Sequence, residues 1–247
     1  MAALSARPCP RGRAYAGSQL QLQIYVNRRS EELSQRVLDA LLMTSLNAHL
    51  RWVSPLESED FAEYRDGAFL DALGRGHLEC QLSRFWPAGG PCWDALAVAE
   101  LGKDPGRSGV LLVEAKSYPD EVYGPGCGAR SRRSLRMIDA ALDETKCWLG
   151  VREDVDWMGR LYQSGNRLAH LYFFLQVGIP AWLVNVYFLN DPCPRYRTTR
   201  EEWNAALPQV KAELGVASFI PHSADVFLEA KDHHELVGPT DVEAGGA

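Results

Sequence analysis

The stretch from Pro91 to Tyr118, PCWDALAVAELGKDPGRSGVLLVEAKSY, constrains the fold of this chain most strongly, because it places charges inside apolar sequence. It has the pattern of two apolar strands joined by a turn, and it carries Asp94, Glu114 and Lys116 among Trp, Ala, Leu and Val. A buried charge costs free energy unless it is paired or bound to a metal ion. The pattern therefore predicts a core β-hairpin whose charged side chains form a site.

Strand parity predicts how these charged side chains lie. Side chains along a strand alternate between its faces, so Glu114 and Lys116 share one face. If the two strands close around the turn Lys103–Gly106, Asp94 lies opposite Glu114 or Ala115. Directly opposed residues have Cβ atoms roughly 5 Å apart, and a divalent cation with oxygen ligands at about 2.0–2.6 Å can bridge two such carboxylates. A cross-strand salt bridge without any function is the alternative interpretation.

The sequence around this hairpin predicts an α/β (α+β) fold with a mixed sheet, because strands and helices are interleaved. The alternation of apolar and polar residues from Gln19 to Val26 predicts a strand. Further strands are expected over residues 52–56, 78–86, 181–189 and 224–230. Helices are expected over residues 30–46, 59–73, 134–149, 159–177 and 201–214.

Length and charge limit the domain organisation and the function class. The 247 residues contain no long linker and no repeat, which favours a single domain over residues 15–230 with its core at about 58–189. Residues 1–14 are expected to be disordered and residues 231–247 to be a flexible tail. The net charge of −6 argues against a constitutive, purely electrostatic nucleic-acid binder, whose surface is basic.

The cysteines and the termini favour a reduced cytoplasmic protein. Six cysteines are scattered without a C-x-x-C pair or a zinc-like spacing, and their density does not indicate a disulfide framework. The first residues, MAALSARPCPRGR, lack an apolar segment of the kind found in signal peptides. The apolar runs are shorter than a membrane span, so no membrane partner is expected.

One helix, expected over residues 159–177, is apolar almost all round except for four polar residues at i, i+3, i+4 and i+7: Gln163, Asn166, Arg167 and His170. This spacing puts them on one face. They either satisfy loop backbone by hydrogen bonds or face the carboxylates. In the second interpretation Arg167 meets a phosphate, and Gln163 holds Glu114 or a water molecule.

A dense basic cluster follows the glycine-rich loop Tyr123–Gly128. It consists of Arg130, Arg132, Arg133 and Arg136. Next to a helix N-terminus such a cluster can receive phosphate groups. Runs of charge are also common on solvated faces, and both interpretations stay open.

The order of an acidic helix, Asp94, the tripeptide Glu114-Ala115-Lys116 and a following helix resembles the PD-(D/E)XK nuclease superfamily, which has the restriction-endonuclease-like fold. The resemblance covers roughly residues 58–189. It implies an αβββαβ core in which Asp94 and Glu114 bind Mg²⁺ (or Mn²⁺) and Lys116 assists the attacking water.

The resemblance also implies supporting residues. The first helix of the superfamily often supplies another acidic residue, for which we choose Glu63, with Glu59 as the competing option. An exonuclease-like branch has Gln-x-x-x-Tyr in the later helix. This chain matches the glutamine at Gln163 but has Arg167 in place of the tyrosine.

These patterns lead to one expected function and to alternatives. The first is a metal-dependent nuclease that hydrolyses phosphodiester bonds in DNA or RNA. The second is a catalytically inactive protein of the nuclease fold that acts as a binding or regulatory partner. A third is a structural partner within a larger complex that pairs through the Gln19–Val26 strand, and a homodimer is a further expectation.

Overall fold

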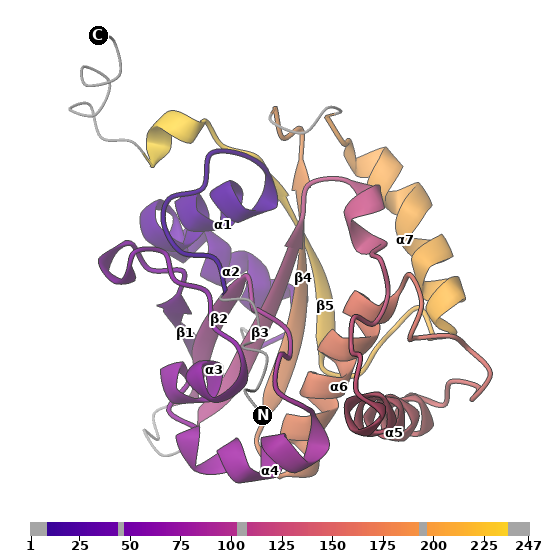
Figure 1. Cartoon of the computed structure of the whole chain (residues 1–247). Coiled ribbons are helices and arrows are strands. Elements are labelled where there is room, and N and C mark those ends of the chain that lie inside the picture. Colours follow the sequence, from indigo (N-terminus) through magenta and orange to yellow (C-terminus); the bar gives the residue numbers. More distant parts are fainter. Residues whose placement is uncertain (1–8, 44–46, 103–107, 193–196, 237–247) are drawn as a thin grey trace, which may run out of the picture.

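The structure is a computed structural model, and it describes residues 9–43, 47–102, 108–192 and 197–236. A single five-stranded sheet has the strand order β1-β2-β3-β4-β5 (Figure 1). Strand β2 is antiparallel to both of its neighbours, β1 and β3, and β3, β4 and β5 are parallel. The prediction of an α/β fold with a mixed sheet is therefore confirmed. The strands are β1 (Ala48–Ser54), β2 (Ala95–Leu101), β3 (Ser108–Lys116), β4 (Ala181–Leu189) and β5 (Ser223–Glu229).

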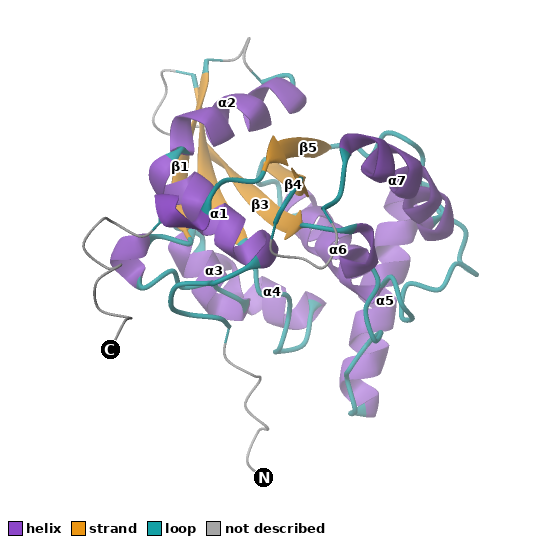
Figure 2. Ribbon diagram, turned by 90° about the horizontal axis from the view of Figure 1, so that it is seen from above, coloured by secondary structure: helices purple, strands orange, loops and turns teal. Residues whose placement is uncertain are grey.

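Helices cover both faces of the sheet. Figure 2 shows α1 and α2 together on one side and α5, α6 and α7 on the other. Each face has its own buried apolar cluster, since alternate side chains of β2, β3 and β4 point to opposite sides. The helices are α1 (Gly17–Arg28), α2 (Ser30–Ala40), α3 (Asp66–Ala72), α4 (Glu79–Phe85), α5 (Arg132–Leu149), α6 (Tyr162–Gln176) and α7 (Arg200–Leu214).

The core hairpin is present with the expected strand pairing. Strands β2 and β3 are antiparallel, with Ala95 paired to Val113 and Val98 to Val110. Continuing this register by one residue puts Asp94 opposite Glu114. The expected turn at residues 103–106 lies outside the described residues.

The elements after the hairpin match the sequence patterns closely. Strand β4 has the predicted limits, and α5, α6, α7 and β5 each begin and end within three residues of the prediction. Strand β4 lies between two parallel neighbours and is nearly all buried, as its continuous apolar sequence indicates.

The prediction of a strand at Gln19–Val26 is wrong, because this segment lies inside helix α1. Every residue from Leu20 to Val26 is buried, so the helix has no solvated face whose 3.6-residue period the sequence would reveal. A partner chain therefore has no edge strand to pair with at this segment.

The buried glutamines of α1 explain how polar residues fit inside. The amide group of Gln21 donates to the carbonyl of Lys231 and accepts from its N–H (3.0 and 2.7 Å). Gln23 makes the same pair of bonds, to the carbonyl of Gly12 and the N–H of Ala14 (3.1 and 2.8 Å). The two chain segments that cover α1 thus satisfy its glutamines, and this tertiary pairing outweighs the alternating pattern.

The prediction of one helix over residues 59–73 is also wrong. A short 3₁₀ turn, η2 (Glu57–Glu59), and helix α3 are separated by irregular chain. Asp60 and Phe61 adopt positive φ values of 54° and 50°, which the interior of an α-helix cannot include, and Asp66 at the start of α3 has a φ of 50°. The segment between them pairs with the loop before β2, at the bridge of Tyr64 with Trp93.

The strand predicted at Leu78–Trp86 is instead the turn η3 (Gly76–Leu78) followed by helix α4. Leu78, Leu82 and Trp86 are the buried residues, and their spacing of four is helical. The third antiparallel strand is β1, which extends the short segment expected at residues 52–56 toward the N-terminus. The helix expected over residues 30–46 ends earlier, at Ala40.

Both ends of the described chain lie against α1. Residues 9–14, expected to belong to a disordered start, hydrogen-bond to the segment before α3: Gly12 N–H donates to Asp60 O, and Glu63 N–H to Pro10 O. Residues 1–8 and 237–247 lie outside the described residues. Within the described ranges, no helix is long and apolar enough to cross a membrane.

Candidate active site

Three carboxylates from three segments of the chain gather where β2 begins and β3 ends. Asp94 directly precedes β2, and its Oδ2 accepts the backbone N–H of Ala115 (2.8 Å). Glu114 is the third-last residue of β3 and its side chain is 7% exposed. Glu63 is buried in the irregular segment before α3. The hairpin register thus brings Asp94 and Glu114 together as the sequence predicted.

The carboxylate of Glu114 is held by three donors. Its Oε1 pairs with the ammonium group of Lys116 and accepts the amide of Gln163 (2.8 Å). Its Oε2 pairs with Nε of Arg167 (2.5 Å). Lys116 shares the strand face of Glu114, as parity requires, and Gln163 and Arg167 come from the polar face of α6. The contact expected between Gln163 and Glu114 is present.

Arg167 is buried and uses all three of its nitrogens within the protein. Besides Glu114, it donates through Nη2 to the carbonyl of Cys92 (2.8 Å) and through Nη1 to the side chain of Asn166 (3.1 Å). The guanidinium also lies 4.8 Å from the centre of the Trp93 ring. Arg167 therefore joins the loop before Asp94 to Glu114, which agrees with the interpretation that the polar face satisfies loop backbone. The alternative contact of Arg167 with a phosphate stays a prediction.

Of the two candidates for a further acidic residue, Glu63 lies at the site and Glu59 does not. Glu59 is exposed in η2. Glu63 is 7% exposed, and its Oε1 accepts the side-chain amide of Gln19 from α1 (2.9 Å). Sequence analysis placed Gln19 in a strand and missed this contact.

The three carboxyl groups differ in electrostatic state. Burial, and after it the charge of Asp94, raises the pKa of Glu63 to about 8. Burial, and after it the charge of Glu114, raises the pKa of Asp94 to about 7. Burial acts in the same direction on Glu114, but the charges and hydrogen bonds of Arg167 and Lys116 outweigh it and lower its pKa. The site therefore holds one fully paired carboxylate, Glu114, and two carboxyl groups whose pKa values are raised by burial and by a neighbouring carboxylate.

Lys116 remains a cation at this site. Burial alone would lower its pKa, but the charges of Glu114 and Asp94 outweigh burial and raise it. A protonated lysine can donate hydrogen bonds and offset negative charge, but it cannot accept a proton from water.

A cavity of about 60 Å³ opens beside these residues, between the sheet and helices α6 and α7. At about 10–15 Å³ for each water molecule, it has room for a few. Lys116, Gln163 and Asn185 supply polar groups to its wall, and much of the rest is apolar. Asn185 is paired in register with Glu114 and donates to Asp225 (3.0 Å). Sequence analysis missed Asn185, although a single amide within the apolar run AWLVNVYFL is a visible signal.

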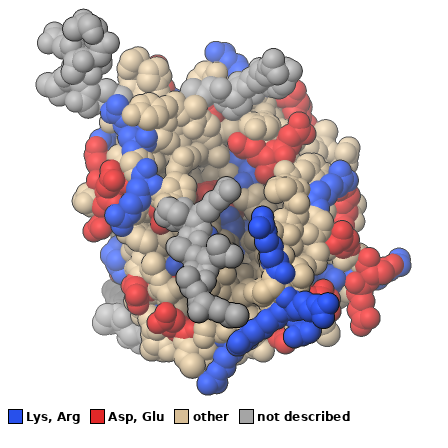
Figure 3. All heavy atoms as spheres, viewed as in Figure 1, with Lys and Arg blue, Asp and Glu red and all other residues tan. Residues whose placement is uncertain are grey.

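The predicted basic cluster lies at the start of α5. Ser131 caps this helix by accepting the N–H of Ser134 (2.9 Å). Blue side chains gather at the lower right of Figure 3, the region of α5 in Figure 1. Arg130, Arg132, Arg133 and Arg136 are all exposed.

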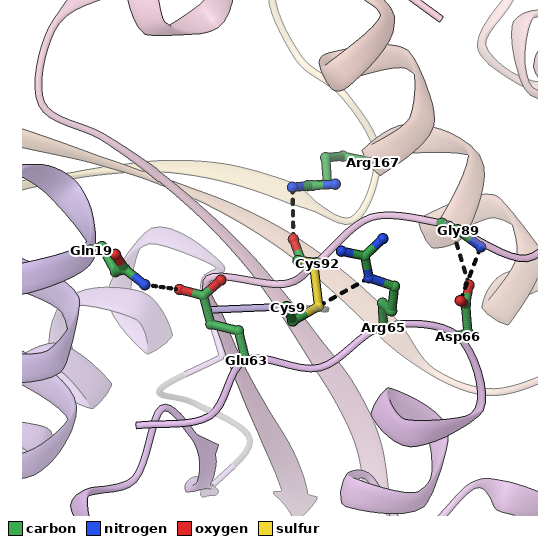
Figure 4. The surroundings of a disulfide bond; sticks show 9 residues. Cys9, Gln19, Glu63, Arg65, Asp66, Gly89, Cys92 and Arg167 are labelled. Carbon is green, nitrogen blue, oxygen red and sulfur yellow. Dashed lines mark hydrogen bonds between the residues drawn. A yellow bond between two sulfur atoms is a disulfide. The ribbon is translucent and has the colours of Figure 1, made fainter. Parts of the chain in front are cut away.

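A disulfide bond joins Cys9 to Cys92 beside the carboxylates (Figure 4). The expectation of a reduced chain is wrong for this pair. The two cysteines are 83 residues apart in the sequence, and only the fold brings the N-terminal segment alongside the loop before β2. Among the described residues, Cys80, Cys127 and Cys147 are free.

The ligand atoms of Glu63, Asp94 and Glu114 do not form a closed metal-binding group. Within the described ranges, the one set of three His, Cys, Asp or Glu side chains with all ligand atoms within 4.8 Å of one another is Asp232, His233 and His234. These three are exposed and adjacent in the sequence, and exposed clusters of this kind are common without an ion. We assign no metal site to them.

Searches for related proteins found no matching family model, no matching curated protein and no matching solved structure.

Proposed function

We propose that this protein is a divalent-cation-dependent hydrolase of phosphodiester bonds in nucleic acid, with the restriction-endonuclease-like fold. The observation that carries the proposal is the convergence of Asp94, Glu114 and Lys116 at one end of the β2–β3 hairpin, with Asp94 bonded to the backbone of Ala115. The three residue types are those that such chemistry needs: two carboxylates for a metal ion and a cation for the phosphate.

The order of elements supports the same fold. Helix α2, strands β1, β2 and β3, the helices α5 and α6, and strand β4 occur in the αβββαβ order that the resemblance implies, with the additional helices α3 and α4 between β1 and β2. In this alignment of elements β1 takes the position of the first strand, Asp94 directly precedes the second strand and Glu114 lies on the third. Glu63 lies outside α2, the helix in the first position.

The donor set fits Mg²⁺ or Mn²⁺. All three acids offer oxygen, which hard cations prefer, and Mg²⁺ commonly binds through one or two carboxylates with water completing its shell. Oδ1 of Asp94 accepts no hydrogen bond from the described residues. Burial and neighbouring carboxylates raise the pKa values of Asp94 and Glu63, so a bound cation would favour their ionised forms. Asp94 and Glu114 would hold the ion, with Glu63 as the third acid, and the bound ion would polarise the phosphate and activate water.

The protein's own residues supply the remaining steps. Lys116, as an ammonium ion, orients a water molecule and offsets charge that builds on the phosphate. Gln163 and Arg167 hold Glu114 in place through their hydrogen bonds. The cavity beside Lys116 and Gln163 provides space for water next to the reacting groups. Arg130, Arg132 and Arg133 offer exposed cations to the phosphates of a nucleic-acid substrate.

The test is cleavage of single- and double-stranded DNA and RNA by the purified protein, with Mg²⁺ or Mn²⁺ and with a chelator. We expect cation-dependent cleavage that falls at least a hundredfold in Lys116→Ala and in Asp94→Ala. Glu100→Ala removes an exposed acid from the same hairpin and should cleave normally. Activity that survives the double variant of Lys116 and Asp94 would falsify the assignment.

A second candidate is a binding or regulatory protein of the same fold that does not cleave. The observation in its favour is that both oxygens of Glu114 are already engaged, by Lys116 and Gln163 on one side and Arg167 on the other. Calorimetric titration with Mg²⁺ or Mn²⁺ separates the two candidates. No heat and no thermal shift at millimolar cation favour the binding protein.

A further inference from the structure

Each cysteine of the disulfide lies next to a segment that carries one of the unpaired acids. Pro10, which follows Cys9, accepts the backbone N–H of Glu63 through its carbonyl (3.1 Å). Cys92 lies two residues before Asp94. Figure 4 shows the disulfide close to Glu63, with the guanidinium group of Arg167 bonded to the carbonyl of Cys92. The cross-link therefore ties the Glu63 segment to the Asp94 segment.

The apolar core lies apart from this cross-link. Two large apolar clusters cover the two faces of the sheet, and neither includes Cys9 or Cys92. The same two segments are also joined by a hydrogen bond from Trp93 N–H to Tyr64 O (3.0 Å), and Gly12 N–H bonds to Asp60 O (2.7 Å). A reduced protein therefore keeps its core and loses one local restraint.

The surroundings of the sulfur atoms favour exchange with an external thiol. Both cysteines are partly exposed. Nε of Arg65 donates to Sγ of Cys9 at 3.2 Å (Figure 4). A cation at this position stabilises negative charge on Sγ when the S–S bond breaks, which makes Cys9 the better leaving group.

We propose that Cys9–Cys92 is a thiol–disulfide exchange site through which a dithiol reductant regulates the neighbouring carboxylate site. The oxidised form holds the Glu63 and Asp94 segments together, and the reduced form lets them separate. The consequence for cation binding rests on the function proposed above, whereas the exchange and the loosening of the two segments do not.

The exchange conserves atoms and electrons. A thiolate of the dithiol attacks Sγ of Cys92, a mixed disulfide forms, and Cys9 leaves as a thiolate that takes a proton from water. The second thiol of the reductant then attacks its own sulfur in the mixed disulfide and releases Cys92, which is protonated in turn. Two electrons and two protons pass to the protein, and the dithiol becomes a cyclic disulfide.

Loosening follows from how the two segments are connected. The N-terminal segment bonds to the Glu63 segment through Glu63 N–H to Pro10 O, and the Glu63 segment meets the loop before β2 at Tyr64 and Trp93. The disulfide adds the covalent restraint between the N-terminal segment and that loop, so its loss leaves the two acid-bearing segments held more weakly. A divalent cation that needs both acids then binds the reduced form more weakly, by about tenfold for a loss near 1.4 kcal/mol.

The experiment compares the oxidised and dithiothreitol-reduced full-length protein without denaturant. The background variant carries serine at the other four cysteines, Cys80, Cys127, Cys147 and Cys193. Mass spectrometry after alkylation should count no free thiol before reduction and two after it. The readout of loosening is hydrogen exchange at the N–H groups of Glu63 and Ala115, which bond to Pro10 and Asp94 respectively. Both should exchange at least tenfold faster after reduction.

The control is Cys9→Ser, which removes the cross-link and leaves Cys92 in its loop. Its amide hydrogen exchange should match that of the reduced protein and should not change when dithiothreitol is added. Its circular dichroism spectrum should match that of the background variant. The proposal is overturned if the disulfide resists dithiothreitol in the native protein, or if exchange at both N–H groups is the same in the oxidised and reduced forms.

Calorimetry with Mg²⁺ on the same samples distinguishes this proposal from the proposed function. Oxidised protein should bind about tenfold more tightly than reduced protein. If neither form binds Mg²⁺, the metal site of the proposed function fails, and hydrogen exchange still decides whether the disulfide controls the two segments.

Discussion

Single residues divide the candidate site into a paired half and an unpaired half. Glu114 forms ion pairs with Lys116 and Arg167, so its carboxylate is ionised and held in one position. Glu63 and Asp94 have no cation bonded to them, and their pKa values rise to about 8 and about 7. Buried acids of this kind are typical of sites that bind a cation or move a proton.

Removal of Arg167 should be costly because Glu114 and the Cys92 carbonyl then lose a buried partner. Arg167→Ala should lower the free energy of unfolding by about 3–5 kcal/mol, measured by urea denaturation. Arg167→Lys keeps the charge but cannot make all the contacts. Its free energy of unfolding should therefore lie between those of the wild type and Arg167→Ala. Arg152→Ala is the control, because its ion pair with Asp154 is exposed and worth less than about 1 kcal/mol. A loss in Arg167→Ala no larger than the control would contradict the role assigned to Arg167.

Stability without divalent cations should fall as the pH rises from about 4 to 8. Glu63 and Asp94 bind their protons more tightly in the folded protein than in the unfolded chain, because their pKa values are raised above 4.5 and 3.8. The folded state therefore loses stability as each group is forced to ionise, and the effect levels off above pH 8. Thermal unfolding in chelator across this range measures it.

Glu63→Gln removes one of these charges and should stabilise the cation-free protein at pH 8.5 by about 2 kcal/mol. It should have little effect at pH 4.5, where the wild-type residue is protonated. Glu59→Gln, at an exposed position four residues earlier, serves as the matched control. Equal stability of Glu63→Gln and wild type at pH 8.5 would show that Glu63 carries no buried charge.

Among the secondary-structure elements, the sequence predicted the limits correctly where the burial of a segment follows one regular pattern. Helix α5 has an apolar face and a solvated face, and its limits were predicted within two residues. Strand β4 is apolar throughout and lies between parallel neighbours. The prediction for helix α1 was wrong because the helix is buried all round and its glutamines bond to segments distant in the sequence. Local periodicity cannot reveal such contacts.

The role of these glutamines can be measured. Gln21→Ala leaves the backbone N–H and carbonyl of Lys231 without their partner inside the fold, and it should destabilise the protein by about 1–3 kcal/mol. Gln35→Ala removes an exposed glutamine from α2 and should change stability by less than about 0.5 kcal/mol. Chemical denaturation of both variants checks this, and equal effects would contradict the buried role of Gln21.

At the scale of the whole molecule, cation binding and folding should be linked. If Mg²⁺ binds the folded protein with a dissociation constant near 1 mM, then 10 mM Mg²⁺ stabilises it by about 1.4 kcal/mol. For a chain of this size the melting temperature then rises by about 3–5 °C. Asp94→Asn should abolish the shift, and NaCl at matched ionic strength should not produce it. A shift that persists in Asp94→Asn would place the cation elsewhere.

The sequence by itself determined the hairpin, the parity of Glu114 and Lys116, and the polar face of α6. These follow from periods of two and 3.6 residues, which are local properties of the chain. Only the tertiary structure decided that α1 is a helix, that Glu63 reaches the site from an irregular segment, and that Cys9 joins Cys92. Each of these depends on which distant segments pack together, and side-chain period carries no information about that. The inward orientation of Arg167 likewise depends on the fold, because its guanidinium group bonds to the carbonyl of Cys92 and to the carboxylate of Glu114.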